Sequence, residues 1–208
     1  MTTAEKTLKD QTNRWIGRED NPSSGPMNKI SSLVDNLSPQ SWLIILLTSG
    51  VGFIFFNLWL GILFEETGYP VALLTSQMRF NAANLKSDFS VLISEGTLND
   101  YKMIQYLDVG IMVSTAVFFG ALTLFSIKGF DKNSDWRKRG YMVALLFPLS
   151  GLLDAIENVF LLIMLEDPLG FPDWLAYVYS SLALAKLVVF IIGIISLIIV
   201  SIAGRRNK

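Results

Sequence analysis

The sequence predicts an all-α fold: an antiparallel bundle of four transmembrane helices, with an amphipathic extracytoplasmic helix between the first two. Three observations support this fold. Of the 208 residues, 51% are hydrophobic, the mean hydropathy is +0.45, and four apolar stretches are long enough to cross a bilayer. A spanning helix needs about 20 apolar residues, and ordinary soluble domains are less apolar than this chain. We therefore expect one polytopic membrane domain at residues 41–204.

The apolar stretches place the membrane helices at about residues 42–64, 99–127, 137–165 and 174–203. The first stretch carries no charge, and the apolar part of the second carries only Asp108, near its start. We expect the second helix to begin outside the membrane and to continue unbroken to residue 127. The later connections are short, which favours antiparallel neighbours.

Residues 1–40 are predicted to form a polar cytoplasmic arm. The arm contains five acidic residues and no early apolar core, so it does not read as a signal peptide. The first membrane helix would then act as an uncleaved anchor. For residues 29–37, a short helix on the membrane surface and plain disorder are both open.

The connection at residues 65–98 is too long for a simple turn. Within it, Leu85, Phe89 and Leu92 fall at helical spacing, whereas Asp88 is expected to point away from this apolar stripe. Gly96 is expected to end the helix. This pattern predicts an amphipathic extracytoplasmic helix that rests on the mouth of the bundle.

The distribution of basic residues predicts the orientation. Residues 128–139 contain five Lys or Arg residues and the C-terminus contains three more, whereas residues 166–176 contain three acids and no base. Cytoplasmic loops carry the excess of Lys and Arg. We therefore expect both termini in the cytoplasm, with the connections 65–98 and 166–176 on the other side.

Composition also excludes several kinds of chemistry. The chain has no Cys and no His, which removes disulfides, haem ligation by these residues, the usual zinc sites and Cys/His nucleophiles. No cofactor or metal is expected. The net charge of −1 gives no basic surface for nucleic acid.

Three ionisable residues interrupt stretches that are otherwise apolar: Asp154 and Glu157 in the third helix and Lys186 in the fourth. An ionised side chain at mid-membrane costs about 2.5–3.5 kcal/mol. Counting at about 1.5 Å per residue places Glu157 and Lys186 at matching depth, with Asp154 one turn deeper. We expect the three to meet, with the Lys186 nitrogen within about 6 Å of a carboxylate oxygen. Two acids against one lysine also predict a shared, exchangeable proton.

Further polar residues are expected around these three. Ser150 and Asn158 share a helical stripe with Asp154 and Glu157, Asn57 in the first helix lies at the same depth, and Asp108 lies nearer the outer boundary. For Ser150 and Asn57 we expect interhelical hydrogen bonds. The predicted intramembrane polar cluster therefore comprises Asp154, Glu157, Lys186, Asn158, Asp108, Asn57 and Ser150.

From about Phe89 onward the chain resembles a widespread family of four-helix integral membrane proteins. The resemblance rests on Asp108 in the second helix, the run from Leu153 to Asn158 with its Asp-x-x-Glu-Asn element, and Lys186 in the fourth. It implies a fold and a set of key residues, but no reaction.

Three functions are open from the sequence. The first is a non-enzymatic accessory or interaction subunit, whose buried ion cluster stabilises the bundle, with or without a bound lipid. The second is a proton-coupled carrier or small-molecule-binding protein that uses Asp154, Glu157 and Lys186. The third is a carboxylate-dependent lipid-modifying enzyme; no residue is assigned as catalytic. The expected partners are the lipid bilayer, a lipid or small hydrophobic ligand, and a larger membrane complex or a homo-oligomer.

Overall fold

A computed structural model describes residues 26–206, and the regular elements among them are all α-helices. The chain divides into two units, Met1–Leu37 and Ser38–Lys208. In the first unit, α2 occupies Pro26–Asn36. Residues 1–25 of the predicted arm lie outside the described residues.

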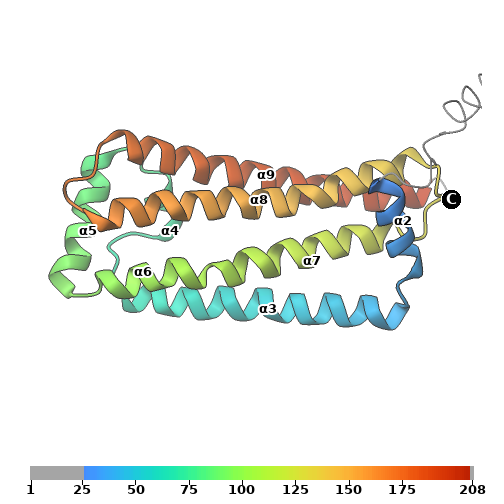
Figure 1. The fold of residues 1–208 in the computed structure, drawn as a ribbon, viewed down its shortest axis with the longest axis horizontal. Coiled ribbons are helices and arrows are strands. Elements are labelled where there is room, and N and C mark those ends of the chain that lie inside the picture. The colour runs from blue at the N-terminus through green and yellow to red at the C-terminus, as the bar shows by residue number, and fades with distance from the viewer. Residues whose placement is uncertain (1–25, 207–208) are drawn as a thin grey trace, which may run out of the picture. The chain divides into compact units, whose positions relative to one another are not determined.

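Four helical stretches are long and apolar enough to cross a membrane, as expected of an integral membrane protein. They are α3 (Pro39–Glu66), α6 with α7 (Leu98–Leu107 and Val109–Ile127), α8 (Asp135–Glu166) and α9 (Trp174–Arg206). Figure 1 shows these helices side by side along their length.

Local sequence explains where two of these helices begin. The Ser38 side chain accepts a hydrogen bond from the backbone N–H of Ser41, and Pro39 occupies the first turn of α3. At α8, Ser134 accepts from the backbone N–H of Trp136. Both arrangements satisfy an N–H group that lacks a partner within the helix.

The second span runs from Leu98 to Ile127 as expected, and Asp108 is only a local interruption between α6 and α7. Asp108 lies between α6 and α7 with φ −60° and ψ −21°, outside both helices. Its backbone N–H still bonds to Ile104 O, so the direction of the chain is kept. Gly110 is a weak helix former close by, and the Asp108 carboxylate is held by another helix.

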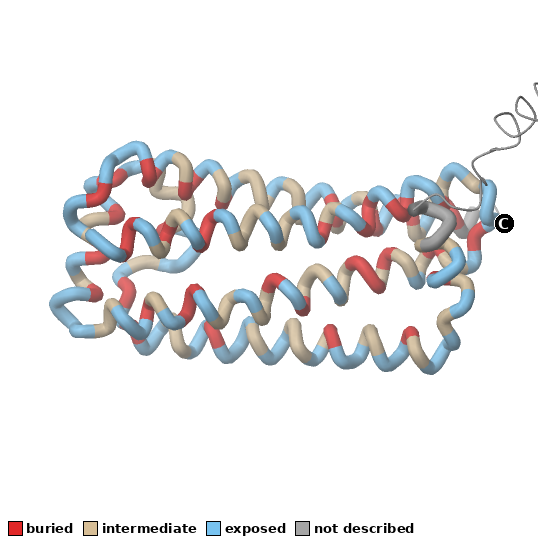
Figure 2. The backbone as a smooth tube through the Cα atoms, in the orientation of Figure 1, coloured by how far each residue is buried: buried red, intermediate tan, exposed pale blue. Residues whose placement is uncertain are grey.

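The helices pack unequally. The α8 helix lies between α7 and α9 and packs extensively against both, whereas α3 packs along α7 and α6. Within the described residues, α3 has no comparable interface with α8 or α9. Only 6% of the most apolar stretch of α3 is buried against the rest of the protein. Figure 2 shows most of this helix as exposed or intermediate. The bundle is therefore a packed trio, α7, α8 and α9, with α3 attached along one side.

Two short helices complete one end of the second unit: α4 (Leu73–Gln77) and α5 (Ala82–Glu95). Asn81 caps α5, and Gly96 ends it with φ +75°, a conformation that glycine adopts readily. Leu85, Phe89 and Leu92 are fully buried, and α5 packs against α6 and α9.

The expectation that Asp88 points away from the buried stripe is wrong. Asp88 is only 6% exposed. Its carboxylate accepts hydrogen bonds from the guanidinium of Arg79, which follows α4. The sequence pattern of α5 could not reveal a cation supplied by a preceding loop.

Candidate functional site

Lys186 lies between the two acids of α8. Its Nζ is 2.5 Å from Asp154 Oδ1 and 2.6 Å from Glu157 Oε2. Both distances are well inside the 6 Å limit set by the sequence argument. One cation from α9 therefore links two carboxylates that lie three residues apart on α8.

The two carboxylates have different surroundings. The side chain of Glu157 is fully buried, whereas those of Asp154 and Lys186 are 18% and 16% exposed. Glu157 pairs with Lys186 through Oε2, and Glu157 Oε1 accepts no hydrogen bond from the described residues. The cluster thus has a closed side at Glu157 and an accessible side at Asp154.

Two further hydrogen bonds join helices around the cluster. The Asn158 amide donates to Asp108 Oδ2 at 2.9 Å, which links α8 to the junction of α6 and α7. Ser150 Oγ donates to the backbone oxygen of Lys186 at 3.0 Å, so the interhelical hydrogen bond predicted for Ser150 is present. These bonds hold α7, α8 and α9 in register.

The interhelical hydrogen bond expected of Asn57 is absent from the described residues. Its amide instead donates to Phe53 O, four residues earlier in α3, at 2.8 Å. The physical reason is the position of α3, which lacks an extensive interface with α8 and α9. Asn57 faces a cavity there, and its own helix supplies the nearest acceptor.

A cavity of about 270 Å³ lies between α3 and the packed trio. Phe53 and Asn57 come from α3, and Lys186 and Phe190 come from α9. Its remaining lining residues are Leu74, Gln77, Ile111, Met112, Thr115, Ser150, Gly151, Asp154, Ala183 and Leu187. Most of this wall is apolar, and the ion pair of Asp154 with Lys186 supplies its charge.

A second cavity of about 310 Å³ lies beside the first, toward α6. The two share Asn57, Gln77, Ile111, Asp154 and Lys186, so they form neighbouring chambers around one ion pair. Asp108, Gln105 and Asn158 line the second chamber, whereas Glu157 lines neither.

Sequence reasoning missed Gln77, which reaches both chambers from α4. No described residue forms a hydrogen bond with its side-chain amide. The available signal was a glutamine at the end of the segment Leu73–Gln77, which begins with two leucines and lies in a connection next to the membrane. That pattern is too weak to place the residue before the fold of α4 is known.

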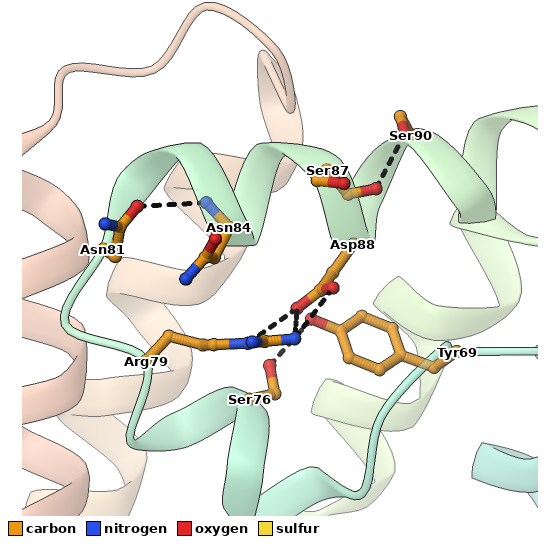
Figure 3. A network of polar contacts seen from close by, with 8 residues as sticks. All are labelled: Tyr69, Ser76, Arg79, Asn81, Asn84, Ser87, Asp88 and Ser90. Atoms are coloured by element: carbon orange, nitrogen blue, oxygen red, sulfur yellow. Dashed lines mark hydrogen bonds and ion pairs between the residues drawn. The ribbon is translucent and has the colours of Figure 1, made fainter.

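A separate polar network fastens α4 and α5 to the bundle, and it was also missed. Figure 3 shows the Arg79 guanidinium against the Asp88 carboxylate, beside the Tyr69 hydroxyl and Ser76, whose oxygens are 2.7 Å apart. The Phe80 N–H donates to Ser180 Oγ of α9 at 3.1 Å. Burial raises the pKa of the Tyr69 phenol, and burial raises the pKa of Asp88 against the opposing effect of Arg79.

The described residues contain no group of three or more His, Cys, Asp or Glu side chains arranged to hold a metal ion. The polar groups at the wall of this largely apolar space are the carboxylates of Asp108 and Asp154, the ammonium group of Lys186 and several side-chain amides.

Comparison of the chain with protein-family models, curated proteins and solved structures gives no match. The resemblance carried by Asp108, Asp154, Glu157, Asn158 and Lys186 therefore stays a prediction.

Proposed function

We propose that this chain is a non-enzymatic integral membrane protein that binds a lipid or lipid-like molecule beside its buried ion cluster. One observation carries the proposal. The charged pair of Asp154 and Lys186 forms part of the wall of a cavity lined otherwise by mostly apolar side chains.

The size and lining of the space suit an amphiphile. Ligand sites are typically clefts of about 300–1,000 Å³ with apolar walls and a few polar groups that fix orientation. Each chamber lies near the lower end of that range. A headgroup would lie among the polar side chains of the chamber nearest α6, and an alkyl chain would pass Asp154 and lie along Phe53, Leu187 and Phe190.

The position of α3 supports access from the membrane. Asn57 is exposed on a helix that carries no other polar residue within a turn of it, and it lines both chambers. Because α3 lacks an extensive interface with α9, a lipid would enter sideways between these helices without crossing the polar end of the bundle.

The proposal assigns the cluster a holding role. Lys186 contacts both carboxylates, and the Ser150 hydroxyl donates to a backbone oxygen. None of these groups is therefore poised as a nucleophile with an adjacent free base. Proton-coupled transport and lipid modification have no separate observation in their favour.

The same proposal includes the topology. The four spans run antiparallel, α5 lies on the extracytoplasmic side, and both termini and the connection at residues 128–134 are cytoplasmic. The distribution of Lys and Arg supports this orientation, which also places the ion cluster in the extracytoplasmic half of the membrane.

A structural role for part of the cluster is the second candidate, and it is compatible with the first. Glu157 is fully buried and lines neither chamber. Its pairing with Lys186 would fix the register of α8 and α9, as expected of an accessory subunit that docks other membrane proteins. Buried ion pairs can serve this purpose without any turnover.

Lipid occupancy tests the proposal. Asn57→Trp places a bulky ring at the wall of both chambers and removes no interhelical hydrogen bond. Leu58→Trp is the matched control, because Leu58 is the next residue of α3, is 65% exposed and lines neither chamber.

Native mass spectrometry of protein purified in a mild detergent should reveal one retained lipid in the wild type and in Leu58→Trp. Asn57→Trp should lose most of it. Equal occupancy in the two variants, or no retained lipid in the wild type after mild extraction, would contradict the proposal.

A further inference from the structure

The chamber nearest α6 is rich in hydrogen-bond acceptors that no protein donor fills. Asp108 Oδ2 accepts from Asn158, but Asp108 Oδ1 accepts from no described residue. The same holds for the side-chain oxygens of Gln105 and Asn57, whose amide nitrogens donate to backbone oxygens of their own helices. These three oxygens are therefore available to an occupant, and so is the side-chain amide of Gln77, which also lines the chamber.

The electrostatic charge of this site is unbalanced as well. Lys186 is the one cationic side chain among the described residues that line the two chambers. It is already engaged by Asp154 and Glu157, at 2.5 and 2.6 Å. Asp108 faces the same chamber with an amide as its polar partner and no cation within ion-pair distance. An ionised carboxylate in a site of low polarity carries a desolvation cost that a nearby cation offsets.

From these two observations we infer that the bound amphiphile carries a cationic headgroup with N–H donors, such as a primary ammonium group on an alkyl chain. The inference rests on the proposed function and names the class of ligand. An ammonium group offers three donors and no acceptor, which suits a site with free acceptors and an uncompensated acid. The ammonium group would lie against Asp108 and Gln105, with its chain passing Asp154 toward Phe53 and Phe190.

The opposite choice, an anionic headgroup such as a phosphate monoester, fits the chamber less well. It would compete with Asp154 and Glu157 for Lys186, and it would approach the Asp108 carboxylate without offering it a donor. A neutral alcohol could use the acceptors but would leave the charge of Asp108 uncompensated.

The test compares headgroups on one chain length. Dodecylamine, dodecyltrimethylammonium, dodecanol and dodecyl phosphate are each titrated into the purified full-length protein in maltoside detergent. One-to-one adducts are measured by native mass spectrometry. Dodecylamine should bind most tightly, the trimethylammonium compound more weakly because it lacks N–H donors, and dodecyl phosphate about tenfold or more below the amine.

Asp108→Asn removes the charge and keeps an oxygen that can accept from Asn158. It should lower the affinity for dodecylamine about tenfold or more, since hydrogen bonds to charged groups are the strong ones. Asp100→Asn is the matched control, because Asp100 is exposed on α6 and lines neither chamber. Gln105→Leu provides a second variant should Asp108→Asn fail to fold. It removes a free acceptor and should weaken the binding of dodecylamine, whereas dodecanol should lose no more than the affinity of one hydrogen bond.

The outcomes separate the two proposals. If dodecyl phosphate or dodecanol binds as tightly as the amine, or if Asp108→Asn binds the amine like the wild type, the cationic headgroup is wrong and lipid binding itself stands. If no probe forms a saturable one-to-one adduct, both the headgroup and the proposed function are wrong.

Discussion

Replacing Lys186 by Met removes the cation that serves both acids of α8. The substitution keeps a long, flexible side chain of similar shape. Its main effect is electrostatic. Glu157, which is fully buried, would be left without the group 2.6 Å away that balances its charge, and Asp154 would lose its partner at 2.5 Å.

The expected loss of stability is dominated by Glu157. Removing one partner of a buried ion pair costs about 3–5 kcal/mol, because an uncompensated charge remains. Asp154 adds less, since its side chain is 18% exposed at the wall of a cavity. For a protein of this size about 1 kcal/mol shifts the melting temperature by about 2–4 °C, so Lys186→Met should melt roughly 6–20 °C below the wild type.

Thermal unfolding in one detergent, followed by tryptophan fluorescence, measures this shift. Lys138→Met is the control, because that lysine is 57% exposed, pairs with Asp135 at 3.5 Å and should contribute less than about 1 kcal/mol. Adding Glu157→Gln to Lys186→Met should recover more stability than adding Asp154→Asn, since the fully buried acid loses more when its cation is removed.

Two results would refute this reasoning. One is a melting temperature for Lys186→Met no lower than that of Lys138→Met. The other is a stronger rescue by Asp154→Asn than by Glu157→Gln, which would place the greater electrostatic cost at the accessible acid.

Three smaller perturbations test other parts of the structure by the same unfolding assay. Arg79→Met should cost about 1–3 kcal/mol, and more above about pH 7 than below about pH 4, because only the ionised form of Asp88 needs the guanidinium. Burial raises the folded-state pKa of Asp88, so the titration of Asp88 favours the folded state at low pH, and this stabilisation is lost as pH rises through that pKa. A pH-independent cost of Arg79→Met would contradict the pairing. Gly140→Ala should cost about 1–3 kcal/mol, because the new Cβ would meet Ile127 Cγ2 at 2.5 Å, and the cost should shrink in an Ile127→Ala background. Ser150→Ala removes one hydrogen bond to a backbone oxygen and should cost about 1 kcal/mol; a cost equal to that of Lys186→Met would be inconsistent with this assignment.

The four long helices could be predicted because their signal is local. Each is an apolar stretch of sufficient length, and a single window of sequence contains all the information needed. The meeting of Lys186 with Asp154 and Glu157 could be anticipated for a related reason: depth follows from counting residues, and membrane-buried charges must find partners.

The rest depends on tertiary arrangement. The sequence of α3 does not reveal that this helix packs along α7 and α6 and lacks an extensive interface with α8 and α9, so the partner expected for Asn57 could not be excluded. The burial of Asp88 depends on Arg79, which reaches it from a loop nine residues earlier. The hydrogen bond of Asp108 also depends on a distant residue, since Asn158 of α8 donates to its carboxylate.

An experimental structure of the wild-type protein in lipid nanodiscs tests the central claim most directly. The measurement is the density between α3 and α9 next to Lys186 and Asp154. The account predicts an elongated, non-protein feature whose polar end lies within hydrogen-bond distance of Asp108 or Asp154 and whose tail extends past Phe190. A structure in which α3 closes against α9, so that protein side chains fill both chambers, would contradict it.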